Sequence, residues 1–222
     1  FASVGLLFIP AVGSLFVVIS GGYVLNDVCD RTVDAVNRPN RALPSQKITP
    51  RAAMITSVIL FAAGLGVSVF CGLKFFGVLA LVVAGLVLYD LYSKKMGIFK
   101  NILAATLTIS LYPLSFALAE AVSTPRLNAL FIFPVWLFLT TVGYEMLKDI
   151  GDVKGDSIRK SNRGYCEHPA FLTAARGIIL AAALLSILPY ILGYCRVLYL
   201  GFSIVTIGLA GWSLWLPPEK AI

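Results

Sequence analysis

Three aspartates with helical spacing follow a long uncharged run near the start of the chain, and the same spacing returns later. Asp27, Asp30 and Asp34 stand at positions i, i+3 and i+7, after 25 residues without a formal charge. At about 100° per residue, a helix places these carboxylates in one narrow stripe. The spacing recurs in KDIGDVKGD at 148–156, where the second set comprises Asp149, Asp152 and Asp156. Six of the eleven acidic residues therefore lie in two matching stripes.

Such stripes are unfavourable unless a cation lies among the carboxylates. Aspartates four residues apart repel each other, as Asp30 and Asp34 do, and acidic groups oppose the dipole at a helix C-terminus. Solvated helix ends are the alternative interpretation, but a solubilising end would more naturally use mixed charges in no fixed register. Carboxylates at the edge of an apolar span are functional by default. We therefore expect each stripe to hold a cation.

Magnesium with a phosphate-bearing substrate fits these residues best. Oxygen ligands favour a hard ion, Mg²⁺ or Ca²⁺. The calcium-loop pattern D-x-D-x-D-G is absent, and Mg²⁺ prefers a few carboxylates together with substrate phosphates. Basic side chains that suit phosphate lie nearby, namely Arg31, Arg38, Arg41, Lys47, Lys94, Lys95 and Lys148. The pattern predicts a diphosphate held by Mg²⁺ between two acidic helices.

The elements that must position these residues are membrane-spanning helices. The chain is 59% hydrophobic and 13% charged, with a mean hydropathy of +0.88, which is typical of membrane proteins. Seven apolar stretches approach the roughly 20 residues that a spanning helix needs, and they are 2–25, 52–73, 75–92, 102–119, 127–147, 171–192 and 197–216. The alternating pattern of a membrane barrel is absent. We predict an all-α bundle of about seven spanning helices, in which Pro10, Pro113, Pro134 and Pro189 kink their helices without ending them.

The positive charge reports topology rather than nucleic-acid binding. The net charge is +7, but Lys and Arg gather after the first, third and fifth apolar stretches. The other turns carry one each, namely Lys74, Arg126 and Arg196. Basic segments stay on the cytoplasmic side, so both acidic sets are expected to face the cytoplasm in a multi-pass protein of the lipid bilayer.

A diphosphate site on a membrane scaffold implies a lipid diphosphate as substrate. If the substrate is allylic, departure of the diphosphate leaves a carbocation that aromatic faces can stabilise. The candidates for this role are Tyr89, Tyr92, Tyr112 and Tyr144. Packing or interfacial anchoring is the alternative role for each of them.

The acidic sets and their neighbours resemble the UbiA superfamily of intramembrane prenyltransferases. The first family motif, N-D-x-x-D-x-x-x-D, is matched by Asn26, Asp27, Asp30 and Asp34. The second, K-D-x-x-D-x-x-G-D, is matched by Lys148, Asp149, Asp152, Gly155 and Asp156. NRPNRALPS at 37–45 resembles N-R-P-x-R-x-x-P-S, although many relatives have glycine at the position of Gln46. The resemblance covers essentially the whole chain, whose seven spans look like family helices two to eight.

The resemblance implies a central cavity that opens to the cytosol and laterally to lipid. It makes 1–222 a single transmembrane prenyltransferase domain, truncated at both ends and capped by segments 35–50 and 153–168. The expected ligands of two Mg²⁺ ions are Asp27, Asp30 and Asp34 for one and Asp149, Asp152 and Asp156 for the other. Asn26 would assist the first site. The expected diphosphate contacts are Arg38, Arg41, Lys94 and Lys148, with Tyr144 directed into the same cavity.

The leading functional interpretation is Mg²⁺-dependent transfer of a polyprenyl group from its diphosphate to a lipophilic acceptor. NRPNR together with KDIGDVKGD most resembles the branch that attaches geranylgeranyl to geranylgeranylglyceryl phosphate in ether-lipid synthesis. Prenylation of an aromatic or macrocyclic acceptor (hydroxybenzoate, homogentisate or chlorophyllide) is the nearest alternative. Phosphatidyltransferases need D-G-x-x-A-R, which is absent here, and a cation or proton transporter would not need the arginines. The spacing of these residues gives neither chain length nor oligomeric state.

Overall fold

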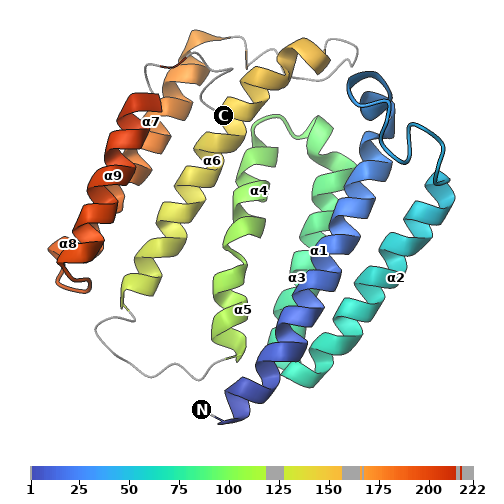
Figure 1. The fold of residues 1–222 in the computed structure, drawn as a ribbon, viewed down its shortest axis with the longest axis horizontal. Coiled ribbons are helices and arrows are strands. Elements are labelled where there is room, and N and C mark those ends of the chain that lie inside the picture. The colour runs from blue at the N-terminus through green and yellow to red at the C-terminus, as the bar shows by residue number, and fades with distance from the viewer. Residues whose placement is uncertain (1, 119–127, 157–165, 167, 214–215, 217–222) are drawn as a thin grey trace. The chain divides into compact units, whose positions relative to one another are not determined.

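Every element described in the computed structural model is helical (Figure 1). The structure describes residues 2–118, 128–156, 166, 168–213 and 216, and for residues 2–4, 37, 94, 151–156 and 213 it describes the backbone alone. The α-helices are α1 (Ala2–Asn37), α2 (Pro50–Ser68), α3 (Leu73–Tyr92), α4 (Phe99–Ile109), α5 (Leu111–Leu118), α6 (Ala129–Asp156), α7 (Pro169–Leu185), α8 (Leu188–Ile191) and α9 (Val197–Ser213). Two short 3₁₀ helices are η1 (Val69–Cys71) and η2 (Ser93–Lys95). The predicted all-α class is confirmed.

The helices form two compact units. In the first unit, α1 packs against α2 and α3, and α3 packs against α5. In the second unit, α6 packs against α4 and α7, and α7 packs against α9. Each acidic set belongs to a different unit. The expectation of a single domain over 1–222 stays a prediction.

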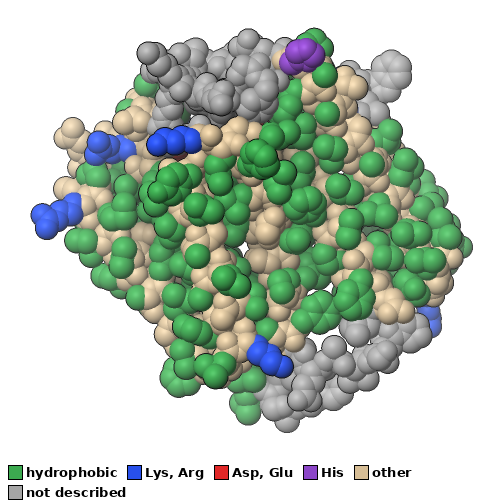
Figure 2. All heavy atoms as spheres, turned by 180° about the vertical axis from the view of Figure 1, so that it is seen from behind, with side chains coloured by type: hydrophobic (Ala, Val, Ile, Leu, Met, Phe, Trp, Pro, Cys, Tyr) green, Lys and Arg blue, Asp and Glu red, His purple; other side chains and the backbone are tan. Residues whose placement is uncertain are grey.

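The described helices are long and apolar enough to cross a membrane six times. The seventh predicted span corresponds to α9, which is apolar but has only 17 residues. Large hydrophobic side chains on the spans are exposed, among them Phe70, Leu73 and Leu81, and hydrophobic side chains dominate the face seen in Figure 2. This surface suits contact with lipid tails, since a water-soluble chain would bury such side chains.

Pro10 and Pro134 lie inside continuous helices, as predicted, but the other two prolines follow helix ends where a continuous helix was expected. Helix α4 ends at Ile109, four residues before Pro113, and α7 ends at Leu185, four residues before Pro189. Proline has no N–H for the carbonyl four residues earlier, and its ring crowds that carbonyl. Each predicted span is therefore divided, 102–119 into α4 and α5 and 171–192 into α7 and α8.

The break between α7 and α8 is closed by side chains of α9. The carbonyl oxygen of Ser186 accepts hydrogen bonds from Tyr199 Oη at 2.7 Å and from Ser203 Oγ at 3.1 Å. A carbonyl freed by a helix break needs such partners because lipid offers none. Helix α9 thus stabilises the interrupted helix through polar contacts as well as through apolar packing.

Glycines permit the closest helix contacts in both units. A Cβ on Gly64 of α2 would lie 2.6 Å from Val18 Cγ2 of α1, and one on Gly143 of α6 would lie 2.5 Å from Ile179 Cγ1 of α7. Both distances are too short for real contacts, so these positions need glycine. Small residues permit such close approach between membrane helices.

The segment after α1 returns the chain to α2 through a tight loop. Thr49 caps α2, its Oγ1 accepting the N–H of Ala52 at 3.2 Å, and Pro50 is the first residue of the helix. Gln46 has a φ of 60°, a left-handed conformation that glycine adopts readily and that other residues adopt rarely. A glycine, which the family resemblance implies for this position, would adopt that backbone conformation without strain.

Candidate functional site

Helix α1 continues past its apolar part and carries the first acidic set. Asp27, Asp30 and Asp34 all precede Asn37, where the helix ends, and the last turn contains no basic residue. The set therefore lies near the negative end of the helix dipole, and no basic residue of the last turn offsets it. The side chain of Asp27 is 49% exposed, whereas that of Asp34 is 11% exposed.

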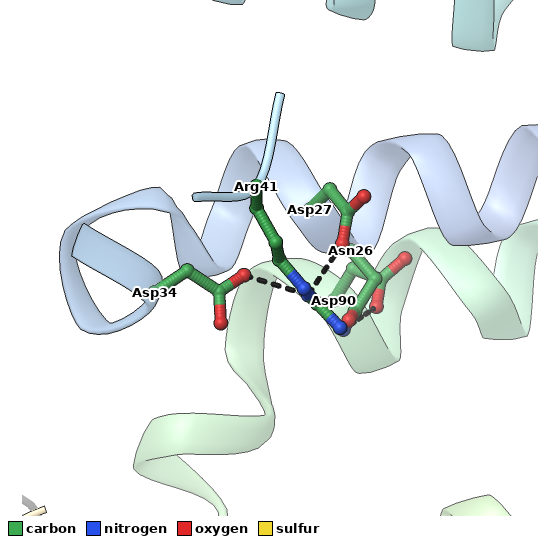
Figure 3. A network of polar contacts seen from close by, with 5 residues as sticks. All are labelled: Asn26, Asp27, Asp34, Arg41 and Asp90. Carbon is green, nitrogen blue, oxygen red and sulfur yellow. Dashed lines mark hydrogen bonds and ion pairs between the residues drawn. The ribbon is translucent and has the colours of Figure 1, made fainter. Parts of the chain in front are cut away.

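The offsetting cation is Arg41, from the loop that follows α1 (Figure 3). Its Nη1 lies 2.9 Å from Asp27 Oδ1 and 2.8 Å from Asp34 Oδ2, and its side chain is 38% exposed. One guanidinium nitrogen therefore joins two carboxylates that lie seven residues apart on the helix. The predicted need for a cation is met here by the chain itself. The predicted contact of Arg41 with a diphosphate stays a prediction.

Asn26 is oriented by a carboxylate that the sequence reasoning missed. Its Nδ2 donates a hydrogen bond of 3.0 Å to Oδ1 of Asp90, a buried residue of α3 (Figure 3). Because the amide nitrogen is held in this way, the amide oxygen of Asn26 is the atom left to face a cation. Asp90 is the only charged residue between Lys74 and Lys94, and that isolation was the signal available in the sequence.

For the other predicted residues of α1, the loops and α3, the structure gives exposure and backbone contacts. Asp30 is partly buried on α1. Arg38 donates its backbone N–H to the carbonyl of Asp34 at 2.7 Å, and its side chain is exposed. Tyr92, at the end of α3, is also exposed. Lys94 lies in η2, and its side chain is outside the described residues.

In the second unit, Asp149 is buried against a lysine of a neighbouring helix. The side chain of Asp149 is 1% exposed, and its Oδ1 forms an ion pair with Lys100 Nζ, whose side chain is 9% exposed. Lys100 lies in the first turn of α4, and Asp149 lies on α6. The sequence reasoning counted Lys100 only as part of the basic segment after the third span and gave it no role in the site.

The remaining predicted residues of α6 divide into exposed side chains and residues without described side chains. Tyr144 and Lys148 are exposed, and Lys148 Nζ lies 3.6 Å from Oε2 of Glu145. Asp152 and Asp156 occupy the end of α6, but their side chains lie outside the described residues. Most of the predicted cap 153–168 lies outside them as well. That the two acidic sets share one chamber stays a prediction, because each unit is described by itself.

Among the described residues, the carboxylates of α1 suit a Mg²⁺ ion better than Asp149 does. Among the side chains that the structure describes, no three acidic, histidine or cysteine groups lie together closely enough to hold a metal. Asp27 and Asp34 nevertheless direct one oxygen each at a single cationic nitrogen. Two carboxylates completed by substrate phosphates and water match what Mg²⁺ prefers. Asp149, by contrast, already has a buried cationic partner.

The comparisons with known proteins agree on one family. The model of the UbiA prenyltransferase family matches residues 2–218. Digeranylgeranylglyceryl phosphate synthase of Sulfolobus acidocaldarius is 34% identical over 88% of this chain and 70% of the relative. The synthase of the same name from Methanopyrus kandleri is 33% identical over 86% of this chain and 68% of the relative.

Solved structures show the same fold. A structure described as digeranylgeranylglyceryl phosphate synthase in membranes is 26% identical, with a TM-score of 0.73 over 97% of this chain and 77% of that chain. A UbiA homologue from Archaeoglobus fulgidus, bound to GPP and Mg²⁺, is 14% identical, with a TM-score of 0.73 over 93% of this chain and 74% of that chain. The second likeness concerns the fold alone.

Proposed function

We infer the function of this chain from one premise, which is that it belongs to the UbiA prenyltransferase family and is an integral, multi-pass membrane prenyltransferase. We propose that it transfers a geranylgeranyl group from geranylgeranyl diphosphate to geranylgeranylglyceryl phosphate, and that it requires Mg²⁺. Two relatives named as synthases of the digeranylgeranyl product support this choice of substrates. The active site is proposed to face the cytoplasm, where the basic segments are expected.

The observation that carries the proposal is the convergence of Asp27 and Asp34 on one cation. The family relationship points to a prenyl diphosphate as substrate. The convergence of the two carboxylates points to a Mg²⁺ ion that would hold this diphosphate. Mg²⁺, when bound, offsets negative charge on the departing diphosphate. Asp27, Asp30 and Asp34 would hold one ion, and the acids of α6 would hold a second.

In the proposed reaction, the bond between C1 of the prenyl chain and the diphosphate oxygen breaks. The hydroxyl oxygen of the glyceryl acceptor forms the new bond to C1 and loses its proton. Arg41 would move from Asp27 and Asp34 to the diphosphate, since a guanidinium binds phosphate oxygens as well as carboxylates. Arg38, Lys94 and Lys148 would add positive charge. Tyr92 and Tyr144 would face the developing carbocation.

The test is a panel of acceptors offered to the purified protein with labelled geranylgeranyl diphosphate. The acceptors are geranylgeranylglyceryl phosphate, 4-hydroxybenzoate, homogentisate and chlorophyllide, each with Mg²⁺ and with EDTA. We expect a prenylated product, identified by mass, with the glyceryl phosphate and Mg²⁺ only. Product from an aromatic or macrocyclic acceptor alone would replace the proposed substrate, and turnover in EDTA would remove the proposed role of Mg²⁺.

A further inference from the structure

An open pocket of about 550 Å³ lies in the first unit, beside the helix that carries the first acidic set. Its walls are the last turns of α1, the loop that leads from α1 to α2 (Figure 1) and the start of α2. Resting on the proposed function, we propose that this pocket binds the phosphate of the acceptor lipid and that Arg31 recognises it. Binding pockets commonly enclose about 300–1,000 Å³, so this volume suits a glyceryl phosphate headgroup.

Arg31 is the cationic side chain among the residues that line this pocket. Its side chain is exposed, and within the part of the chain that the structure describes it forms no ion pair. Arg41, by contrast, already lies between Asp27 and Asp34. The guanidinium of Arg31 can therefore donate two parallel N–H bonds to a phosphate, a ligand whose geometry arginine matches.

The start of α2 adds polar groups to the same pocket. Thr49 and Pro50 line it, so the positive end of the α2 dipole lies at the pocket. Thr49 Oγ1 accepts the N–H of Ala52, and its hydroxyl proton can be donated to a ligand. Thr32 and Gln46 bring a second hydroxyl group and an amide. These groups suit the oxygens of a phosphate or of a glyceryl group.

The rest of the lining is apolar, which favours a phosphate carried on a lipid over inorganic phosphate. Four side chains form these walls, namely Ala35, Leu43, Pro44 and Ile48. Leu43 is buried, so the pocket has a fixed apolar wall as well as an exposed cation. The glycerol carbons and the first carbons of the ether-linked chain would contact such walls.

The position of Arg31 on α1 connects this pocket to the proposed reaction. Arg31 follows Asp27 by four residues and precedes Asp34 by three, so it is a neighbour of both on the helix surface. One turn of helix rises about 5.4 Å. Only the glycerol carbons separate the phosphate of the acceptor from its free hydroxyl. A phosphate at Arg31 would therefore leave that hydroxyl within reach of a prenyl diphosphate held through Asp27 and Asp34.

The first experiment measures geranylgeranyl transfer at saturating Mg²⁺ by the original chain, Arg31→Gln and Arg51→Gln. Arg51 is exposed in the first turn of α2 but does not line the pocket, so it is the matched control for loss of one positive charge. We expect Arg31→Gln to raise the KM for geranylgeranylglyceryl phosphate by about tenfold or more, because a charged hydrogen bond to the phosphate is lost. Its kcat and its KM for geranylgeranyl diphosphate should stay within about twofold, as should all values for Arg51→Gln.

Two further variants separate recognition of the phosphate from loss of structure. Arg31→Lys should recover part of the lost acceptor affinity, since lysine supplies the charge but not the paired N–H groups. Ala35→Leu keeps Arg31 but narrows the pocket, so it should raise the KM for the acceptor alone. An unchanged acceptor KM in Arg31→Gln, an equal rise in Arg51→Gln, or a rise in the KM for the diphosphate instead would each overturn the proposal.

Failure of the proposed function would look different, because lipid binding is measured without Mg²⁺ and without turnover. The probes are labelled geranylgeranylglyceryl phosphate, geranylgeranylglycerol and phosphatidylglycerol, each titrated into the purified protein. A phosphate monoester carries about 1.5–2 negative charges near pH 7. The original chain should therefore bind the first probe about tenfold or more tightly than the other two, and Arg31→Gln should remove this preference.

The binding results separate the pocket from the reaction. If the original chain shows this preference but transfers no prenyl group, the proposed function fails and the phosphate site stands. Equal affinity for geranylgeranylglyceryl phosphate and geranylgeranylglycerol would overturn the phosphate site. Equal affinity for phosphatidylglycerol would make the pocket a site for bilayer headgroups and overturn its role in binding the acceptor.

Discussion

Arg41 beside the first acidic set and Lys100 beside the second both place a positive charge on predicted metal-binding aspartates, but water reaches them to different extents. Arg41 comes from a loop, and its side chain is 38% exposed. The side chain of its partner Asp27 is 49% exposed. Lys100 comes from a helix and is 9% exposed, and its partner Asp149 is 1% exposed. An exposed pair is worth about 0–1 kcal/mol, whereas breaking a buried pair costs about 3–5 kcal/mol.

This difference shows how a chain can hold like charges together before a metal binds. An exposed cation offsets repulsion and can then be exchanged for a metal ion at small energetic cost. A buried cation such as Lys100 is costly to exchange, because it would be left without a counter-charge. Two motifs with the same spacing can therefore contain aspartates with different tasks.

The largest expected contrast is in stability, between Asp149→Asn and Asp34→Asn. Asp149→Asn leaves the Lys100 ammonium buried without a counter-charge and should lower the free energy of unfolding by about 3–5 kcal/mol. Asp34 is itself only 11% exposed, but Asp34→Asn leaves Arg41 beside water and still paired with Asp27, so the loss should be about 1 kcal/mol. Denaturant unfolding of both metal-free variants in the same detergent measures the contrast, and equal losses would remove the distinction between the two sets.

An intermediate effect, on metal affinity, is expected when Asp90 is replaced. Asp90 orients Asn26 but belongs to neither acidic motif. Asp90→Leu removes the acceptor of the Asn26 amide and should weaken Mn²⁺ binding by about tenfold, as loss of a group that orients a metal ligand commonly does. Asp90→Asn keeps an oxygen acceptor and serves as the matched control. Titration of Mn²⁺ into both variants tests this, and equal affinities would assign Asp90 no part in orienting the site.

The smallest effect is the response of the two pairs to salt. Raising the salt from about 0.1 M to 1 M shortens the screening length from about 10 Å to about 3 Å, which weakens exposed pairs much more than buried ones. The destabilisation caused by Arg41→Met should therefore shrink by a few tenths of a kcal/mol, while that caused by Lys100→Met should stay constant. Unfolding curves at the two salt concentrations measure this, and an equal salt response would contradict the assigned exposure.

The helices and their ends follow from local features of the sequence. Apolar runs of spanning length locate the membrane helices, and Thr49 with Pro50 marks the start of α2. Pro113 and Pro189 lie four residues after helix ends, a signal that was read as kinks rather than as breaks. The spacing of the first acidic set indicated that a cation offsets the repulsion; Arg41 lies there in the structure, and the expected metal ion stays a prediction.

The partners of the acids could not be predicted in the same way. Lys100 and Asp149 are 49 residues apart, and Asn26 and Asp90 are 64 residues apart. Which side chains meet across two helices depends on how each helix is rotated, and several rotations satisfy the same apolar pattern. Burial, which separates the role of Lys100 from that of Arg41, emerges only from that packing.

The Ser186 carbonyl bears on how the chain enters the membrane. Its two hydrogen-bond donors, Tyr199 and Ser203, both belong to α9. Until α9 is in place, an interrupted α7 would expose this oxygen to hydrocarbon, which is unfavourable. Helices α7, α8 and α9 are therefore best inserted as one hairpin, so that α9 completes the interrupted helix that precedes it.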